Sequence, residues 1–273
     1  MDVIEAHVRR LPALDGRWTP RPVPEAESLT ALLAGQVAGI ASHPLDNVRN
    51  NALMLLDADP DKEFGMPGIA ANLTLEDILQ LVETAAGAPI DRDARFGPVD
   101  IRPEPILAEC RAAGRRLHLA RERGESVILA TGHPVGLALL YHAIDGWLDA
   151  GGARVLRAAH GIHWRDSHLD HDWFIDHWDG VAMLTDGREP RHTHRPNAVE
   201  RMLEEVTPDL VVADHGFAGA AIWAGVETIS IADVNDPALL VARSLGRTEH
   251  VIVMDDHVDP GAYWPCFQAI AAV

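Results

Sequence analysis

Hydrophobic positions follow different patterns in the two halves of the chain. Between residues 25 and 123 apolar residues recur at helical spacing, for example in 25–39 and in 74–87, where Thr74 is placed to cap the helix. From residue 126 onward they gather in short unbroken runs, which are typical of strands buried on both faces of a parallel sheet. The predicted strands cover residues 126–130, 153–158, 180–184, 210–214, 227–233 and 250–256.

The segments between these runs have the length of crossover helices, so right-handed βαβ units can connect the strands. We therefore predict an α/β fold in which residues 124–273 form a doubly wound, mainly parallel, Rossmann-like sheet, for which we assume the strand order 3-2-1-4-5-6. Residues 1–123 are predicted to form a mostly helical N-terminal domain or cap with a proline-rich extended arm at 12–24. Residues 160–179 are too polar and aromatic for a plain crossover helix, and we expect an inserted, partly irregular segment rich in His and Trp.

Composition limits the partners and the compartment. The chain has 273 residues, of which 47% are hydrophobic, enough for one large domain or two small ones. A net charge of −18, with Lys62 as the only lysine, argues against a nucleic-acid partner, because phosphate binding needs clustered Lys and Arg. No apolar stretch reaches the length of a membrane span, and the first residues lack a signal-peptide core, so we expect a cytoplasmic protein without a membrane partner. Cys110 and Cys266 are expected to be buried thiols, and a homodimer is left open.

Reactive side chains follow the first and fourth predicted strands. In open α/β sheets ligands bind outside the carboxyl ends of the strands, and the predicted strand order brings these two loops to one crevice. Gly132 lets the backbone approach a ligand, and the helix that Pro134 begins presents free N–H groups to an anion. A tight turn with a capping histidine is the structural alternative for the first loop. The candidate residues of the two loops are Thr131, Gly132, His133, Asp214, His215 and Gly216.

The fifth and sixth strands end in side chains that carry oxygen atoms. Asp233 and Asn235 follow the fifth strand, whereas Asp236 is explained as the cap of the next helix. Asp255 and Asp256 follow the sixth strand, and only one of them can point to a given face. Such oxygen ligands suit Mg²⁺ or Mn²⁺. We predict a site for one of these metals made by Asp214, Asp233, Asn235, Asp255 and Asp256.

Two other segments contain candidate substrate-binding residues. His192 and His194 lie two positions apart in an extended segment, which places both rings on one side, where they can bind a metal or an oxyanion. In the N-terminal half, Asp46, Asn47 and Arg49 crowd the first turn of a helix, where the guanidinium of Arg49 can meet a phosphate as a fork. The structural alternative there is a well-capped exposed helix with an interdomain ion pair.

Similarity to a known family runs nearly end to end, through the segments PLDNVRNN, ARFGPV, LATGHPVGL, HTHRP, VVADHGFAGAAI, ADVNDPAL and VIVMDDHV. With these segments the chain resembles a family of actinobacterial proteins named phosphatases. The resemblance implies hydrolysis of phosphate monoesters, but it transfers no residue roles and identifies no substrate.

The sequence does not fit two common phosphatase classes. A DxDxT nucleophile motif would follow the first strand, where residues 130–133 read Ala-Thr-Gly-His, and Cys110 lies in a helical pattern instead of a phosphate-binding loop. We therefore predict a hydrolase that removes phosphate from a small phosphorylated metabolite by metal-assisted attack of water. His133 or His215 would be the general acid, and Asp214 the third catalytic residue. The alternative is a lyase, cyclase or isomerase that acts on a small carboxylate or sugar phosphate with Asp and His as acid and base.

Overall fold

Strands from the C-terminal half build the central sheet of the structure, a computed structural model that describes residues 3–166 and 171–273. The strands are β3 (Ser126–Ala130), β4 (Arg154–Val155), β5 (His163–Asp166), β6 (His171–Trp178), β7 (Val181–Thr185), β8 (Leu210–Asp214), β9 (Thr228–Ala232) and β10 (His250–Val253). They lie in the order β10-β9-β8-β3-β7-β6-β5, with β4 paired to β3. The strands β3, β8, β9 and β10 therefore end at the same edge, since all four run parallel.

The pairing around β3 differs from the predicted strand order. β4 pairs with Ser126 and Val127 at the start of β3, whereas β7 pairs in parallel with Leu129 and Ala130 at its end. Because β4 has only two residues, it is too short to cover this edge of β3, and the third predicted strand reaches β3 directly. A mixed α/β fold with a mostly parallel sheet is confirmed. The prediction that the second strand separates the first from the third is wrong.

The inserted segment at 160–179 extends the sheet by two antiparallel strands, β6 beside β7 and β5 beside β6. Along β6 the buried side chains of Trp173, Ile175 and His177 alternate with half-buried ones, as expected of an antiparallel strand with one covered face. The segment is thus more regular than the sequence predicted. Its residues 167–170 lie outside the described residues.

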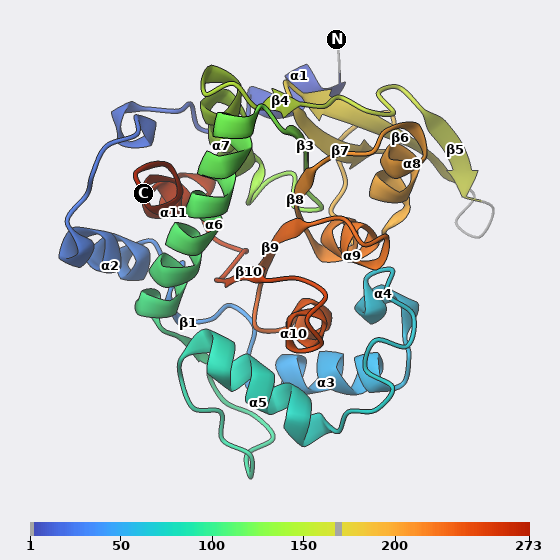
Figure 1. The fold of residues 1–273 in the computed structure, drawn as a ribbon. Coiled ribbons are helices and arrows are strands. Elements are labelled where there is room, and N and C mark those ends of the chain that lie inside the picture. Colours follow the sequence, from blue (N-terminus) through green and yellow to red (C-terminus); the bar gives the residue numbers. More distant parts are fainter. Residues whose placement is uncertain (1–2, 167–170) are drawn as a thin grey trace.

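Helices lie on both sides of the sheet. They are α1 (Val3–Val8), α2 (Glu25–Ala34), α3 (Leu45–Leu56), α4 (Pro60–Glu63), α5 (Leu75–Ala86), α6 (Pro103–Arg123), α7 (Ala138–Ala150), α8 (Asn197–Glu205), α9 (His215–Trp223), α10 (Pro237–Ser244) and α11 (Trp264–Ala271), with the 3-10 turns η1 (Gly16–Trp18) and η2 (Pro260–Tyr263). Figure 1 shows α6, α7 and α11 on one side and α8, α9 and α10 on the other.

Most described residues of 1–123 are helical or in loops, apart from the two-residue strands β1 (Gly39–Ile40) and β2 (Asp100–Ile101). The predicted cap of α5 is confirmed, because Thr74 and Asp77 form a reciprocal capping box. Helices α3 and α5 pack against α10, and α6 packs against α11 and β10. The start of α3 is thereby brought to the strand ends. The division of the chain into two domains stays a prediction.

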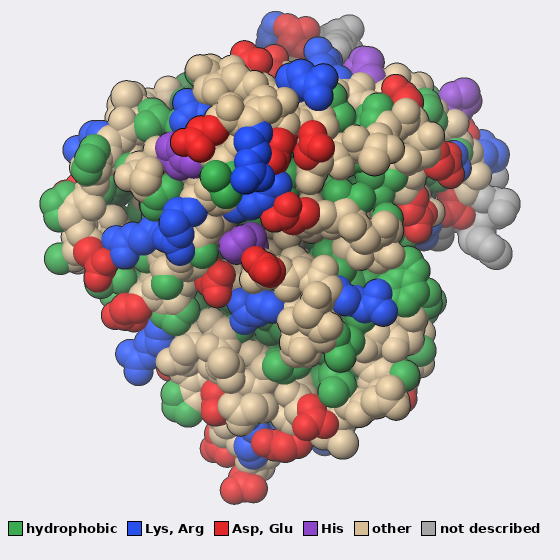
Figure 2. Space-filling model, viewed as in Figure 1, with side chains coloured by type: hydrophobic (Ala, Val, Ile, Leu, Met, Phe, Trp, Pro, Cys, Tyr) green, Lys and Arg blue, Asp and Glu red, His purple; other side chains and the backbone are tan. Residues whose placement is uncertain are grey.

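The surface contains acidic and basic side chains in mixture. On the face shown in Figure 2, Lys and Arg are interspersed with Asp and Glu instead of forming one broad patch. Within the described part of the chain, none of the helices combines the length and the apolar composition that crossing a membrane requires.

Candidate functional site

Five aspartates are buried where β8, β9 and β10 end, each with at most 3% of its surface exposed. They are Asp214, Asp233, Asp236, Asp255 and Asp256. In the described residues none of them pairs with Lys or Arg, and their ion pairs are all with histidines. A buried carboxylate without a cationic partner is strongly destabilising. This arrangement therefore favours a bound cation.

Asp214 links the loops that follow β3 and β8. Its carboxylate accepts hydrogen bonds from the Thr131 hydroxyl at 2.6 Å and from the Gly132 N–H at 2.7 Å. The same carboxylate lies 3.6 Å from Nδ1 of His133 and 3.9 Å from Nδ1 of His215. Burial alone would raise the pKa of Asp214, but its interactions with His133, His215 and Thr131 hold that pKa below its ordinary value. Asp214 is thus a carboxylate that orients two imidazoles.

The opposite ring nitrogens of these histidines point to two other aspartates. Nε2 of His215 lies 3.1 Å from Asp236 and 3.7 Å from Asp256, and Nε2 of His133 lies 3.4 Å from Asp256. The ligand atoms of His215, Asp236 and Asp256 all lie within 4.8 Å of one another. A histidine that turns one nitrogen to a metal and the other to a carboxylate is the usual arrangement in metal sites.

A second group lies beside the first and comes from the N-terminal half of the chain. His43, Asp233 and Asp256 also place their ligand atoms within 4.8 Å of one another. Nδ1 of His43 is 2.6 Å from Asp233, although 190 residues separate the two in sequence. The hydrogen bond with Asp233 raises the pKa of His43. The sequence pattern assigned His43 no role and did not predict this contact.

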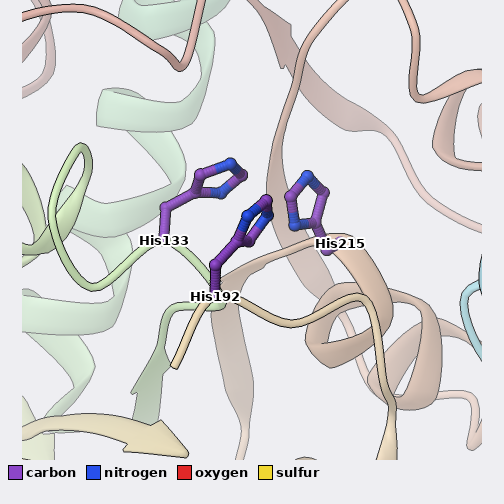
Figure 3. A group of neighbouring side chains, drawn as sticks. All are labelled: His133, His192 and His215. Atoms are coloured by element: carbon purple, nitrogen blue, oxygen red, sulfur yellow. The ribbon is translucent and has the colours of Figure 1, made fainter. Parts of the chain in front are cut away.

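A third group comprises His133, His192 and His215, whose rings face one another in Figure 3. The ring centroid of His133 is 4.1 Å from that of His215 and 4.5 Å from that of His192. His192 and His194, which the sequence predicted to lie on one side of an extended segment, have different partners. Nδ1 of His194 contacts Asp61 at 2.9 Å. His192 joins the histidine cluster, and His194 lies at its edge.

Two of the buried carboxyl groups, those of Asp256 and Asp233, have pKa values above the ordinary value of aspartate. Burial, then the charges of Asp233, Asp236 and Asp214, raises the pKa of Asp256 well above its ordinary value. Burial also raises the pKa of Asp233 to about 6, against the opposing hydrogen bond of His43. Carboxyl groups held so close together compete for protons, and a divalent cation would stabilise their ionised forms.

Three further side chains near the cluster form hydrogen bonds of their own. The amide of Asn235 donates to Asn47 at 3.1 Å. Asp255 accepts from the Ser42 N–H at 2.6 Å and the Ser42 hydroxyl at 2.9 Å. Asp236 occupies the N-cap position of α10 without a side-chain cap bond, and its carboxylate accepts from the backbone of Asp233 at 3.1 Å. The interpretation of Asp236 as a cap is therefore wrong, because its carboxylate turns inward to His215.

Glycines let the loops of the cluster approach one another. A Cβ atom on Gly132 would lie 2.4 Å from the carbonyl oxygen of Thr193, and one on Gly216 would lie 2.0 Å from that of His194. Both positions require glycine because no side-chain atom fits there. The loops that follow β3 and β8 therefore pack closely against residues 192–194.

Two cavities adjoin this region. One of about 390 Å³ is lined by His133, Pro134, Val135, Gly136, Pro190, His192, Asp256, His257 and Val258, and therefore opens onto the cluster. A groove of about 560 Å³ is lined by Asp46, Asn47, Arg49, Asn50, Leu53, Asp93, Ala94, Arg95 and Phe96. Arg49 in this groove donates to the carbonyl of Arg92 at 3.4 Å. The start of α3, where the sequence predicted substrate-binding residues, thus adjoins the site through the hydrogen bond between Asn47 and Asn235.

A profile of the family described as Phosphatase matches residues 25–271, nearly the whole chain. The chain belongs to this family. A Streptomyces coelicolor protein named Phosphatase SCO2771 is 29% identical over 253 residues, which cover 89% of this chain and 94% of that protein. The resemblance inferred from the sequence is confirmed, and it supports a phosphate-hydrolysing enzyme. The lyase, cyclase or isomerase alternative gains no support from these matches.

Proposed function

We propose that the chain removes phosphate from a small phosphorylated metabolite by metal-assisted attack of water. The observation that carries the proposal is the convergence of His215, Asp236 and Asp256 on one point at the strand ends, within 4.8 Å. Family membership supports phosphate hydrolysis, and the histidine–aspartate groups support a metal as the electrophile.

The donor set fits a divalent cation. Nδ1 of His133 and Nδ1 of His215 are buried and form no hydrogen bond with the described residues, while the carboxylate of Asp214 lies near both. For His215, whose Nε2 belongs to the group with Asp236 and Asp256, this is the arrangement expected when a metal binds the opposite nitrogen and tightens the ring against its carboxylate. A bound cation would polarise the phosphoryl oxygens and lower the pKa of a water molecule.

We place the substrate in the cavity of about 390 Å³, which is lined by His133, His192 and Asp256 of the cluster. Its other walls contain Pro134, Val135, Gly136, Pro190, His257 and Val258, and none of its lining residues is Lys or Arg. Such largely apolar walls suit the uncharged part of a small substrate. The volume and the lining thus support a small phosphorylated metabolite.

His133 is the better candidate for the general acid. It lines the substrate cavity, whereas His215 does not line that cavity and is only 3% exposed. A proton donor must come within hydrogen-bond reach of the leaving oxygen, which a cavity-lining ring can do. Asp214, with its hydrogen bonds from Thr131 and Gly132, would hold the ring of His133 in place.

The test combines metal analysis with phosphate release over a panel of phosphorylated metabolites. We expect the purified protein to lose phosphate release when a chelator removes its metal, and to regain it when the metal is returned. Asp256→Asn should abolish release. The matched control is Asp209→Asn, since Asp209 directly precedes β8, at the end of the strand opposite to Asp214, where it accepts from the Ser126 N–H at 2.8 Å. Undiminished phosphate release by fully stripped protein would refute the metal role.

A further inference from the structure

The two histidine–aspartate groups at the strand ends have one residue in common, Asp256, whereas a further group, of His142, Asp145 and Asp179, shares no residue with them. One group is His215, Asp236 and Asp256, and the other is His43, Asp233 and Asp256. Their five residues do not form a single group within the 4.8 Å limit. An ion with bonds of about 2.0 to 2.2 Å reaches donor atoms no more than about 4.4 Å apart. One ion therefore cannot bind the donor atoms of both groups.

We propose that the site holds two divalent cations bridged by the carboxylate of Asp256. The first ion is bound by His215 and Asp236, and the second by His43 and Asp233. A carboxylate has two oxygens and can give one to each ion, which suits the separation of about 3.5 to 4 Å found in two-metal hydrolases. This inference deepens the proposed function and rests on it.

The charge of the site agrees with two ions. Five buried carboxylates, those of Asp214, Asp233, Asp236, Asp255 and Asp256, lie at the strand ends without Lys or Arg partners among the described residues. With all five ionised, two dications leave one negative charge, whereas a single dication leaves three. The second ion therefore reduces the repulsion of an anionic phosphate ester.

The third group, of His133, His192 and His215, does not add a third ion. His215 is needed by both this group and the first one, and its Nε2 faces Asp236 at 3.1 Å. Its other nitrogen, Nδ1, is buried on the side of Asp214 at 3.9 Å. No nitrogen of His215 is left for another ion, so His133 and His192 flank the first ion on the cavity side.

The donor atoms also identify the class of metal. Each of the two groups proposed to bind an ion contributes one imidazole nitrogen besides its carboxylates. Mg²⁺ prefers oxygen ligands and keeps much of its water, whereas Zn²⁺, Mn²⁺ and Fe²⁺ accept imidazole readily. We therefore assign the two positions to transition metals of this kind. Of the two metals that the oxygen-rich motifs suggested, this choice keeps Mn²⁺ and drops Mg²⁺, and it adds Zn²⁺ and Fe²⁺.

Metal content per chain tests the inference without reference to activity. The wild-type protein saturated with Mn²⁺ should contain two ions by elemental analysis and show the electron paramagnetic resonance signal of two coupled Mn²⁺ ions. His43→Ala and Asp236→Ala should each retain one ion and lose the coupled signal, and Asp256→Ala should lose the coupled signal. Asp209→Asn is the control and should retain both. Circular dichroism checks that each variant folds.

The outcomes separate this inference from the proposed function. One ion per chain in saturated wild-type protein that still releases phosphate would overturn the two-ion site and leave the function standing. Two coupled ions in a protein that hydrolyses none of the phosphate esters would overturn the proposed function and leave the two-ion site standing. Binding of Mg²⁺ in preference to Mn²⁺ and Zn²⁺ in a competition titration would overturn the choice of metal.

Discussion

Replacing Asp214 with asparagine tests whether this buried residue orients the metal-binding histidines or binds a metal itself. Its carboxylate accepts from Thr131 at 2.6 Å and from Gly132 at 2.7 Å, and it lies 3.6 Å from Nδ1 of His133 and 3.9 Å from Nδ1 of His215. Asparagine has almost the same shape. Its oxygen can still accept from Gly132, and its NH₂ group can donate to the hydroxyl of Thr131. The fold should therefore survive.

The substitution removes the negative charge that lies beside Nδ1 of His133 and Nδ1 of His215. Loss of such a supporting carboxylate typically weakens metal affinity or activity by about 10- to 100-fold. Each tenfold step corresponds to about 1.4 kcal/mol, so the expected loss in binding free energy is about 1.4 to 2.8 kcal/mol. Removal of a true metal ligand would instead eliminate an ion from the protein. The number of bound ions therefore distinguishes the two roles.

The assay is competition for the metal by a chelator of known affinity, followed by metal analysis and phosphate release. We expect Asp214→Asn to retain its number of ions at saturation, with weaker affinity and slower turnover. Asp209→Asn makes the same chemical change beside Ser126 and should leave both quantities unchanged. If Asp214→Asn binds metal and turns over substrate as the wild type does, the orienting role is refuted.

Three other predictions concern packing, substrate binding and pH. Gly216→Ala should lower the free energy of unfolding by about 1 to 3 kcal/mol, because the new Cβ would lie 2.0 Å from the carbonyl oxygen of His194; an unchanged melting temperature would contradict this. Arg49→Ala should leave both KM for the phosphate ester and metal content unchanged, because Arg49 lines the groove of about 560 Å³ and not the cavity proposed for the substrate; a raised KM in steady-state kinetics would place Arg49 in the substrate site. Burial lowers the pKa of His177 to about 3. Between pH 6.5 and 3, His177 is therefore protonated in the unfolded chain but not in the folded one. Stability should therefore fall as the pH falls from 6.5 toward 3, by at most about 1.4 kcal/mol per pH unit from this group, and less steeply in His177→Gln; equal slopes in urea unfolding would exclude this cause.

Local sequence patterns determined the elements that are buried on both faces. The apolar runs at 126–130 and 210–214 coincide with β3 and β8, because strands in the interior of a parallel sheet need apolar side chains at every position. The cap at Thr74 was equally predictable, since a capping box lies within one helical turn. These signals arise between near neighbours in the chain.

Part of the site also followed from the sequence. His133 and His215 come directly after β3 and β8, and the ends of parallel strands meet at one edge. Asp233 and Asp256 follow β9 and β10 for the same reason. Once the strands were recognised, it was foreseeable that these residues lie near one another.

Only the tertiary structure decided the rest. His43 meets Asp233 across 190 residues because α3 packs against α10, and no local pattern encodes that contact. Asp236 has a sufficient local explanation as a helix cap, and only its position beside His215 shows that its carboxylate serves the cluster. Burial and periodicity determine which segments become strands and helices, whereas side-chain direction and long-range packing decide which residues form one site.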